Sequence, residues 1–422
     1  MYYTSIQDAG LFEEVADAPY GLFWQISSNP MLFDQPFRTR GDGTSLGQRF
    51  PFILPVPGSD AVKNIDWSVF FPISSSPGYR TDNKLPYAEH FNFSIQRGIG
   101  TKTLVTVAYV GTEGHKLFSH YEANPGNAAL CLSLRGSGVK QGTLQCGPNQ
   151  EDATYTLPNG SELVGTRSPL GSVYYSEDSY LATVANSAFH SLQATVERRA
   201  GDLTFLAAYT FSKSLDNAST YGGYLDFYNF ALGRSLSSFD ATHNFVASYV
   251  WEVPFRRAFP SLPKRLTSGW SISGITRFAT GLPVTLTESG DRSLTGGSGV
   301  DRPNYVGGLV ITSDVRNTPN HTYFNKSAFT QEDLGGQGTA APRFFHGPGT
   351  ENFDLAVQKN TTIRESMSVQ FRAEFFNAFN HANFNNASTP AGANGSFTSA
   401  NFGRVTVASP GRIGQMSLKF LW

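Results

Sequence analysis

The chain ends in Arg412–Trp422, RIGQMSLKFLW, and this stretch bears most directly on the fold. Counting back from Trp422, every second residue is apolar: Phe420, Leu418 and Met416. The intervening positions are mostly polar, and this period of two predicts a strand with one apolar face. In water, such a hydrophobic and unblocked strand at the edge of a sheet would promote aggregation. The ending therefore favours a strand that faces an apolar medium over an ordinary edge strand.

The same alternation recurs along the chain. Residues 203–212, LTFLAAYTFS, place Leu, Phe, Ala, Tyr and Phe on one face. No segment has a convincing helical period, and scattered prolines and glycines count against long helices. Because an antiparallel sandwich with one wet face shows the same alternation, the pattern alone leaves both architectures open. The expected strands lie at about 91–96, 103–109, 189–199, 203–212, 244–253, 270–280, 353–363, 367–379 and 413–422, with a further candidate at 64–71.

The connections between these strands alternate strictly between short and long. In a compact soluble domain, structureless loops of the longer kind are uncommon. In an outer-membrane barrel, short periplasmic turns and long extracellular loops are the rule. The predicted fold is therefore all-β, an antiparallel transmembrane β-barrel. The expected turns lie near 98–101, 200–202, 254–268 and 364–366, and the expected long loops at about 111–187, 214–242, 281–351 and 380–411.

Composition excludes several other classes of protein. The 422 residues carry a net charge of -1, and only 15% are charged, against roughly 25% in soluble domains. Aromatic residues make up 14%, more than a disordered chain carries. A nucleic-acid-binding protein would be clearly basic, so no nucleic-acid partner is expected. A membrane-spanning helix needs about 18 consecutive apolar residues, and the sequence has no such run.

The two cysteines, Cys131 and Cys146, lie in a polar, glycine-rich stretch. Neither is accompanied by a CxxC motif or a histidine cluster, so neither indicates a metal site. In an oxidising compartment, a disulfide between them would close a loop of about 15 residues and stabilise it by about 3 kcal/mol. The alternative is two unpaired thiols.

Motifs of catalysis and cofactor binding are missing from the sequence. It contains no HExxH, GxSxG, Walker or GxGxxG pattern, so we expect no enzyme, no catalytic residues, no cofactor and no metal. Asp291 and Asp301 lie in a Gly/Ser-rich loop, but their spacing does not match an EF-hand calcium loop. Arg372 and Glu374 are interpreted as lumen-facing charges that are solvated or paired with the next strand. We expect His243 and His381, each beside a strand end, to be interfacial or structural.

Several segments resemble one known family in the same order. At the C-terminal end they are NFDLAVQKNTTIRESMSVQFRAEFFNAFNHANF (352–384), NFGRVT (401–406) and RIGQMSLKFLW (412–422). Upstream they are LPYAEHFNFSIQRGIGTKTLVTVAYVGTEGHKL (85–117), YTFSKSLDNAS (209–219), SSFDATHNFVASYVWEVPF (237–255) and SGWSISGITRFATGLPVTL (268–286). Together they are similar to the C-terminal part of Oar-like TonB-dependent outer-membrane receptors, especially the acidobacterial type. The resemblance runs from about residue 85 to the end and is weaker in 1–84.

The resemblance implies a long receptor in the bacterial outer membrane. In that family a plug domain, on which the periplasmic TonB protein pulls, occludes a barrel of about 22 strands. This sequence contains no plug, TonB box or signal peptide, so we expect residues 85–422 to be the C-terminal portion of a larger barrel. Residues 1–84 are weakly assigned as barrel or loop. Expected partners are outer-membrane lipid, the TonB system only through the missing plug, and the barrel-assembly machinery, which would recognise a signal formed by Met416, Leu418, Phe420 and Trp422.

The function that follows is energised uptake of a siderophore, carbohydrate or peptide, in the context of the missing plug. Two alternatives remain open. A self-contained small outer-membrane barrel, acting as a porin or adhesin, requires enough strands in 1–84 to close the sheet. A secreted soluble β-sandwich that acts as a binding module requires polar residues on one sheet face only.

Overall fold

The computed structural model describes residues 2–3, 78–219, 224–297, 300–312, 314–364, 367–384 and 391–422. The strand candidate at 64–71 lies outside the described residues, as does most of the segment 1–84. Within the described ranges, no helix is both long enough and apolar enough to cross a membrane.

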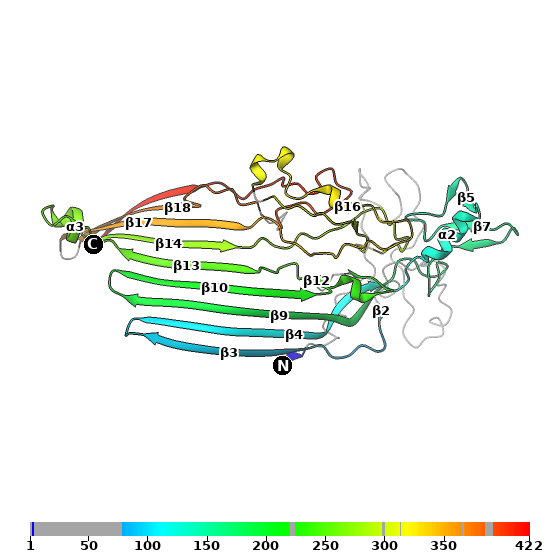
Figure 1. The fold of residues 1–422 in the computed structure, drawn as a ribbon, viewed down its shortest axis with the longest axis horizontal. Helices are drawn as coiled ribbons and strands as arrows, with labels where there is room; N and C mark the ends of the chain where they lie inside the picture. Colours follow the sequence, from blue (N-terminus) through cyan, green and yellow to red (C-terminus); the bar gives the residue numbers. More distant parts are fainter. Residues whose placement is uncertain are drawn as a thin grey trace, which may run out of the picture.

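Among the described residues, nine long strands form the main sheet, and each is antiparallel to its long neighbours (Figure 1). They follow one another in chain order, as a meander, and the two-residue β1 (Tyr2–Tyr3) pairs with the first of them. All nine strands expected from the alternation are confirmed. They are β3 (Tyr87–Ile99), β4 (Thr103–Glu122), β9 (Ser179–Ala200), β10 (Leu203–Asp216), β13 (His243–Glu252), β14 (Trp270–Ala279), β17 (Thr350–Arg364), β18 (Met367–Phe376) and β19 (Ile413–Leu421).

Strands β4 and β9 are longer than the sequence predicted. The loop expected at 111–187 begins only after Glu122 and ends before Ser179. Two irregularities in the pairing, between Gly114 and Ser119, interrupt the alternation there. Beyond them the end of β4 is buried on both faces, including polar residues such as His120. A strand that is covered on both sides loses the period-two signal, which explains the error.

The short connections lie together at one end of the strands, which is also the end where the chain terminates (Figure 1). Residues 201–202 join β9 to β10, and Gly201 has a φ of 69°, a left-handed conformation that favours glycine. Residues 253–269 carry the one-turn helices α3 (Phe255–Ala258) and α4 (Lys264–Thr267). At Gly269 a Cβ atom would lie 2.3 Å from the Asn360 carbonyl oxygen, so no larger residue fits.

The described parts of the long connections, 123–178, 217–242, 280–349 and 377–412, lie together at the opposite end and form what we call the loop layer. The predicted alternation of short and long is thus confirmed. The layer has its own secondary structure: α2 (Ala128–Gly136); the pairs β5 (Lys140–Gln141) with β6 (Leu144–Gln145), β7 (Thr154–Thr156) with β8 (Glu162–Val164), and β15 (Asn304–Tyr305) with β16 (Phe329–Thr330); and the short helices η4 (Phe230–Gly233), η5 (Val315–Asn317), η6 (Pro319–His321) and η7 (Lys326–Ala328). Next to the layer, β2 (Gly78–Tyr79), β11 (Tyr224–Leu225) and β12 (Ser235–Leu236) extend the main sheet.

Helix α2 was not expected from the sequence. Its N-cap is Asn127, whose side-chain oxygen accepts a hydrogen bond of 3.0 Å from the Leu130 amide. The helix has nine residues and buries only Cys131 and Leu134, so its apolar stripe is too short to give a helical period.

Most of the buried apolar side chains belong to the loop layer and the strand ends beside it. The largest cluster centres on Phe324, which makes edge-to-face contacts with Phe345 and Phe402 at ring-centroid distances of 5.0 and 5.1 Å. A second cluster surrounds Cys131 and Cys146, and a third surrounds Tyr121 at the end of β4. The long loops are therefore packed structures with cores of their own.

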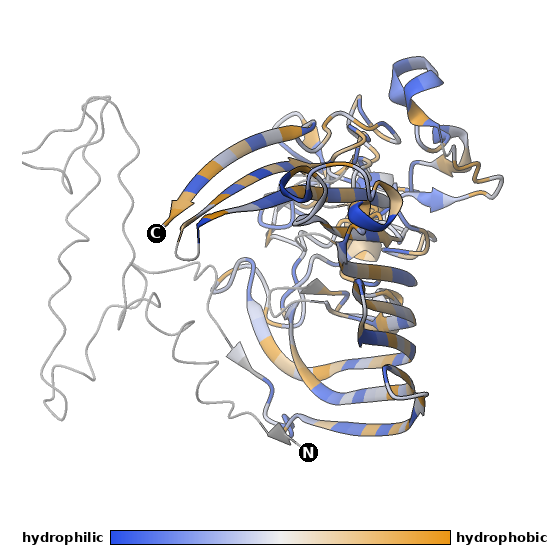
Figure 2. Cartoon of the chain, turned by 90° about the vertical axis from the view of Figure 1, so that its left-hand side faces the viewer, coloured by the Kyte–Doolittle hydropathy of each residue, from blue (hydrophilic) through white to orange (hydrophobic). Residues whose placement is uncertain are grey.

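The sheet curves strongly when viewed along its strands (Figure 2). Residues paired across antiparallel strands point to the same face, so one row contains Phe205, Tyr249, Leu355 and Phe375. On this apolar face, large side chains are exposed: Phe93 on β3 is 67% exposed. Such a surface suits a lipid environment.

Candidate functional site: the polar face of the strand wall

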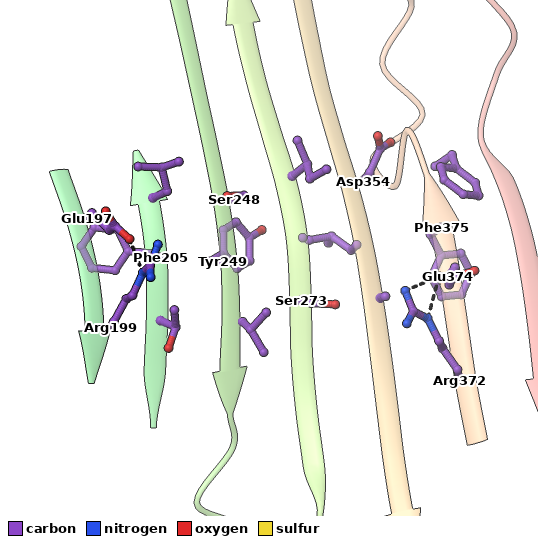
Figure 3. Close-up of a pocket in the computed structure, with 18 residues that line it drawn as sticks. Glu197, Arg199, Phe205, Ser248, Tyr249, Ser273, Asp354, Arg372, Glu374 and Phe375 are labelled. Carbon is purple, nitrogen blue, oxygen red and sulfur yellow. Dashed lines mark hydrogen bonds and ion pairs between the residues drawn. The ribbon is translucent and has the colours of Figure 1, made fainter. Parts of the chain in front are cut away.

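The face opposite the aromatic rows contains a trough of about 500 Å³ that crosses β9, β10, β13, β14, β17 and β18 (Figure 3). Most of its side chains come from one set of alternate positions, since Leu206 pairs with Ser248 and Ser248 with Ile275. Phe205, Tyr249 and Phe375, from the intervening set, also border it (Figure 3). The antiparallel register therefore brings together residues that lie up to 179 positions apart in the chain, as Glu197 and Phe376 do (376 − 197 = 179).

One side of the trough is charged by Arg372 and Glu374 on β18 (Figure 3). The Arg372 Nε donates to Glu374 Oε1 at 2.6 Å, and the Gln415 side chain of β19 donates to the same carboxylate. Arg372 and Glu374 were expected to be solvated or paired with the next strand. They instead pair with each other within β18, and the contact with β19 is made by the Gln415 amide. Residues i and i+2 share a strand face, which allows this pairing.

The other side of the trough is charged by Glu197 and Arg199 on β9, which also form an ion pair two residues apart (Figure 3). Between the two pairs lies Asp354, whose Oδ1 accepts hydrogen bonds of 2.9 Å from the Asn352 side chain and the Asn377 amide. None of these three residues was predicted from the sequence. Opposite charges at i and i+2 in a predicted strand, as in Glu197 and Arg199, are the signal that would have found the pair.

The floor between the charged sides is largely apolar. Leu206, Val250 and Ile275 lie there and are 45%, 46% and 51% exposed. A surface with charged edges and an uncovered apolar centre can contact a molecule that is itself amphipathic. Within the described residues, no group of three or more His, Cys, Asp or Glu side chains is arranged to hold a metal ion.

In the loop layer, Cys131 and Cys146 form a disulfide, with their Cα atoms 5.4 Å apart. Both are buried in the second core of the layer, which belongs mainly to residues 123–178, here called the disulfide lobe. Leu294, from the connection 280–349, inserts into this core and is 1% exposed. One long connection therefore docks directly onto another.

Polar contacts surround this docked leucine. The Gly126 amide donates to the Thr295 carbonyl at 2.7 Å, and the Asn149 amide donates to Asp291 at 2.9 Å. Asp291 also shares a hydrogen bond with the Glu151 side chain, and burial, together with this contact, raises the pKa of Glu151 to about 8. Two carboxyl groups in contact share a proton more readily than they both ionise. The proton therefore helps hold the two connections together.

The other residues noted in the sequence do not form one site. Asp291 accepts from the amides of Thr295 and Gly296, and Asp301 interacts with Ser293, so both serve the loop backbone. The His243 ring lies 2.8 Å from the Tyr209 hydroxyl on the apolar face. His381 lies 3.7 Å from Glu351.

The C-terminal residues Met416, Leu418 and Phe420 lie on the apolar face of β19, and each is at least 58% exposed, while Trp422 is 92% exposed. Among the described strands, β19 pairs only with β18. Recognition of these residues during barrel assembly stays a prediction.

A profile described as "Outer membrane beta barrel domain" matches residues 1–415. No curated protein matches the chain. Similar solved structures are the outer membrane transporter YddB from Escherichia coli (9% identity, TM-score 0.36), the FrpB iron transporter from Neisseria meningitidis (9%, 0.34) and P. aeruginosa FpvA bound to heterologous pyoverdines (9%, 0.27). They cover 82%, 82% and 81% of this chain, which spans only 34%, 33% and 31% of theirs.

The family match extends over nearly the whole chain and agrees with the meander of antiparallel strands and its lipid-suited face. The place of such a domain is the bacterial outer membrane. An apolar face towards lipid and a polar face, with its trough, towards the lumen are expected there. The chain belongs to the outer membrane beta barrel domain family.

Proposed function

We propose that this chain forms part of the barrel wall and the outer loops of an Oar-like TonB-dependent receptor, which takes up a ligand across the outer membrane without acting as an enzyme. The trough on the polar face is the observation that carries the proposal, because it offers both charged and apolar contacts where a passing ligand or a plug would lie. Residues 85–422 are the barrel portion in this proposal. The family resemblance of residues 85–422 supplies the TonB dependence.

The folded loop layer supports uptake more than free diffusion. A general pore needs an open mouth, whereas here four long connections pack on three apolar clusters at the end of the strands. A compact layer of this kind suits selective capture of a ligand, whether siderophore, carbohydrate or peptide. In the proposed orientation, the loop layer is extracellular and the short turns are periplasmic.

The test compares three strains of the native host: the parent, a deletion of the gene for this protein, and a deletion of the gene for TonB. Each is grown in complex medium, and the compounds consumed are measured by mass spectrometry. The proposal expects at least one compound that the parent consumes and both deletion strains leave behind. Consumption that depends on this protein but persists without TonB would refute the receptor and favour a self-contained pore.

A second arm tests the trough itself. Substitution of both Arg372→Gln and Glu374→Gln removes one charged side while keeping the side-chain sizes, and uptake of the compound found above is expected to fall. The matched control is Lys326→Gln, in the loop layer, where the ammonium lies over the Phe397 ring 4.9 Å from its centroid and away from the trough. Equal uptake by the Arg372→Gln, Glu374→Gln variant and the parent would show that the trough is not needed for uptake.

A further inference from the structure

A second cavity, of about 200 Å³, lies inside the loop layer and plays no part in the proposed passage along the wall. It is formed where the connections 217–242 and 280–349 meet. Its volume is below the roughly 300–1,000 Å³ of most drug-sized binding sites, so any ligand is small. The residues that carry its chemistry are Asn217, Asp226, Ser238, Thr287, Arg302 and Arg343.

Arg302 is the unusual member of this set. The residue is 6% exposed, and its Nε has no hydrogen-bond partner among the described residues. One terminal nitrogen donates to the Leu232 carbonyl at 2.8 Å, which leaves donors of the guanidinium uncommitted. A buried guanidinium without matched acceptors is costly, so this arrangement points to an acceptor supplied from outside the chain.

Arg343 provides a second guanidinium to the same cavity, but it is held in place by the protein. Its Nε donates to the Leu236 carbonyl at 2.5 Å, and its terminal nitrogen lies 3.2 Å from Asp216. The contrast is informative: Arg343 has an anionic partner, whereas the described residues place no ion-pair partner on Arg302. Of the charged residues that line the cavity, two are arginines and one is an aspartate.

The acidic groups that act on Arg302 are poor competitors for it. Asp226 accepts a hydrogen bond of 2.8 Å from the Asn229 amide, and burial raises its pKa. Burial also raises the pKa of Glu332 to about 8 and that of Asp301 above its ordinary value. Since burial opposes the negative charge of all three carboxyl groups, the positive charge of Arg302 remains only partly neutralised.

We propose that this cavity binds a small oxyanion, a carboxylate, phosphate or sulfate group, carried on a polar molecule no larger than a monosaccharide. Guanidinium groups bind such oxyanions through paired, charge-assisted hydrogen bonds. Arg302 is the principal binding residue, and Arg343 is the second cation. The Ser238 and Thr287 hydroxyls and the Asn217 amide offer hydrogen bonds to the rest of the ligand.

The first experiment uses the full chain folded in detergent micelles and isothermal titration calorimetry. The probes are galacturonate, its uncharged methyl ester, inorganic phosphate and inorganic sulfate, each up to about 10 mM, beyond which an affinity has little meaning. At least one of the three anions is expected to bind. The ester should bind about tenfold or more weakly than galacturonate if the carboxylate is the recognised group. Stronger binding of phosphate or sulfate would assign the oxyanion to that source instead.

The second experiment repeats the titrations with variants. Arg302→Gln is expected to weaken binding of the preferred anion about tenfold or more, and Arg302→Lys, which keeps the charge but loses the planar fork, by an intermediate factor. Arg316→Gln is the control, because Arg316 lies in the same connection with its side chain 62% exposed. Its affinity should equal that of the parent.

The proposal is overturned if none of the anions binds the parent chain, or if galacturonate is the preferred anion and binds no better than its ester. Both results come from the unmodified protein, so they stand even if the Arg302 variants do not fold. Unchanged affinity in folded Arg302→Gln would also overturn it. Because binding is measured without transport, failure of this inference and failure of the proposed uptake are distinguishable.

Discussion

Large apolar side chains are exposed on the strand wall, the nine long strands of the main sheet, and buried in the loop layer. On the wall, large residues such as Phe93 and Met416 are 67% and 72% exposed, while small residues such as Ala373 are among the few buried apolar ones. In the loop layer, Phe324 is 1% exposed. The difference is expected if the wall faces lipid and the layer faces water: lipid is itself apolar, so only the layer would have a hydrophobic reason to collapse on a core. The following experiments test this contrast, beginning with the largest expected effect.

Substitution of Phe324→Ala should destabilise the loop layer by about 3–5 kcal/mol, because it opens a cavity in the largest core. The measurement is urea-dependent protease cleavage of the loops in folded, detergent-solubilised protein. Phe239→Ala is the matched control, since Phe239 lies in the same layer but is 61% exposed. Equal cleavage profiles for the two variants would mean that the layer has no cooperative core.

The adjacent residues Ala207 and Ala208 of β10 test which face of the wall meets lipid. Ala207 shares the face of Phe205, and Ala208 the polar face of Leu206. Arginine on a lipid face costs about 2–4 kcal/mol near the bilayer midplane, whereas lumen positions tolerate it. Ala207→Arg should therefore lower the stability of the barrel in lipid vesicles by up to about 4 kcal/mol, measured by guanidinium titration, and Ala208→Arg should change it little. The reverse order would exchange the two faces.

Replacement of both cysteines, Cys131→Ser with Cys146→Ser, should destabilise the disulfide lobe by about 3 kcal/mol, the value for a loop of this length. The effect should be local, because the bond lies within one connection and the wall strands lie outside it. Hydrogen exchange followed by mass spectrometry provides the readout. Faster exchange confined to 123–178 and the docked segment near Leu294 is the expected result, and equal acceleration in β13 would contradict it.

The last prediction concerns pH. The Glu151 pKa rises from 4.5 to about 8 on folding, so between these values the folded state binds the extra proton and its stability falls as pH increases. Below about 4.5 and above about 8 this contribution is flat. In Glu151→Gln the loss between pH 5 and 8 should diminish, as followed by hydrogen exchange at the contact with Asp291. The pH dependence that remains in this variant is expected from Glu122 and Glu332, whose pKa values burial also raises. An unchanged pH profile in the variant would show that the proton on Glu151 does not stabilise the contact.

Prediction from sequence succeeded where the signal is local. The period-two alternation of β10 and β13 is a property of short windows, so all nine strands were found, and the alternation of short and long connections followed from their positions. The ends of β4 and β9 were missed, because the loop layer covers them on both faces. Helix α2 was missed, because only two of its nine residues are buried.

For the candidate sites too, local features were predicted from the sequence and contacts between distant segments were not. Arg372 and Glu374 were placed on the lumen side from alternation alone, but their pairing within one strand and the contact with Gln415 depend on the register of β18 and β19. Asp301 was noted in the sequence, whereas its neighbour Arg302 was not. Nothing local distinguishes an arginine that will be buried without an ion-pair partner from one that will be solvated.

By itself, the sequence determined the medium and the architecture: alternating apolar residues, few charges and a terminal strand ending in Met416, Leu418, Phe420 and Trp422 fit a barrel wall in lipid. Only the tertiary structure decided that the long connections fold into a layer with its own cores, that Leu294 of one connection completes the disulfide core of another, and that Arg302 and Arg343 meet in one cavity. The physical reason is distance along the chain. Alternation between faces is a property of neighbouring residues, whereas packing between loops depends on contacts between segments that are distant in the sequence and that the register of the sheet brings together.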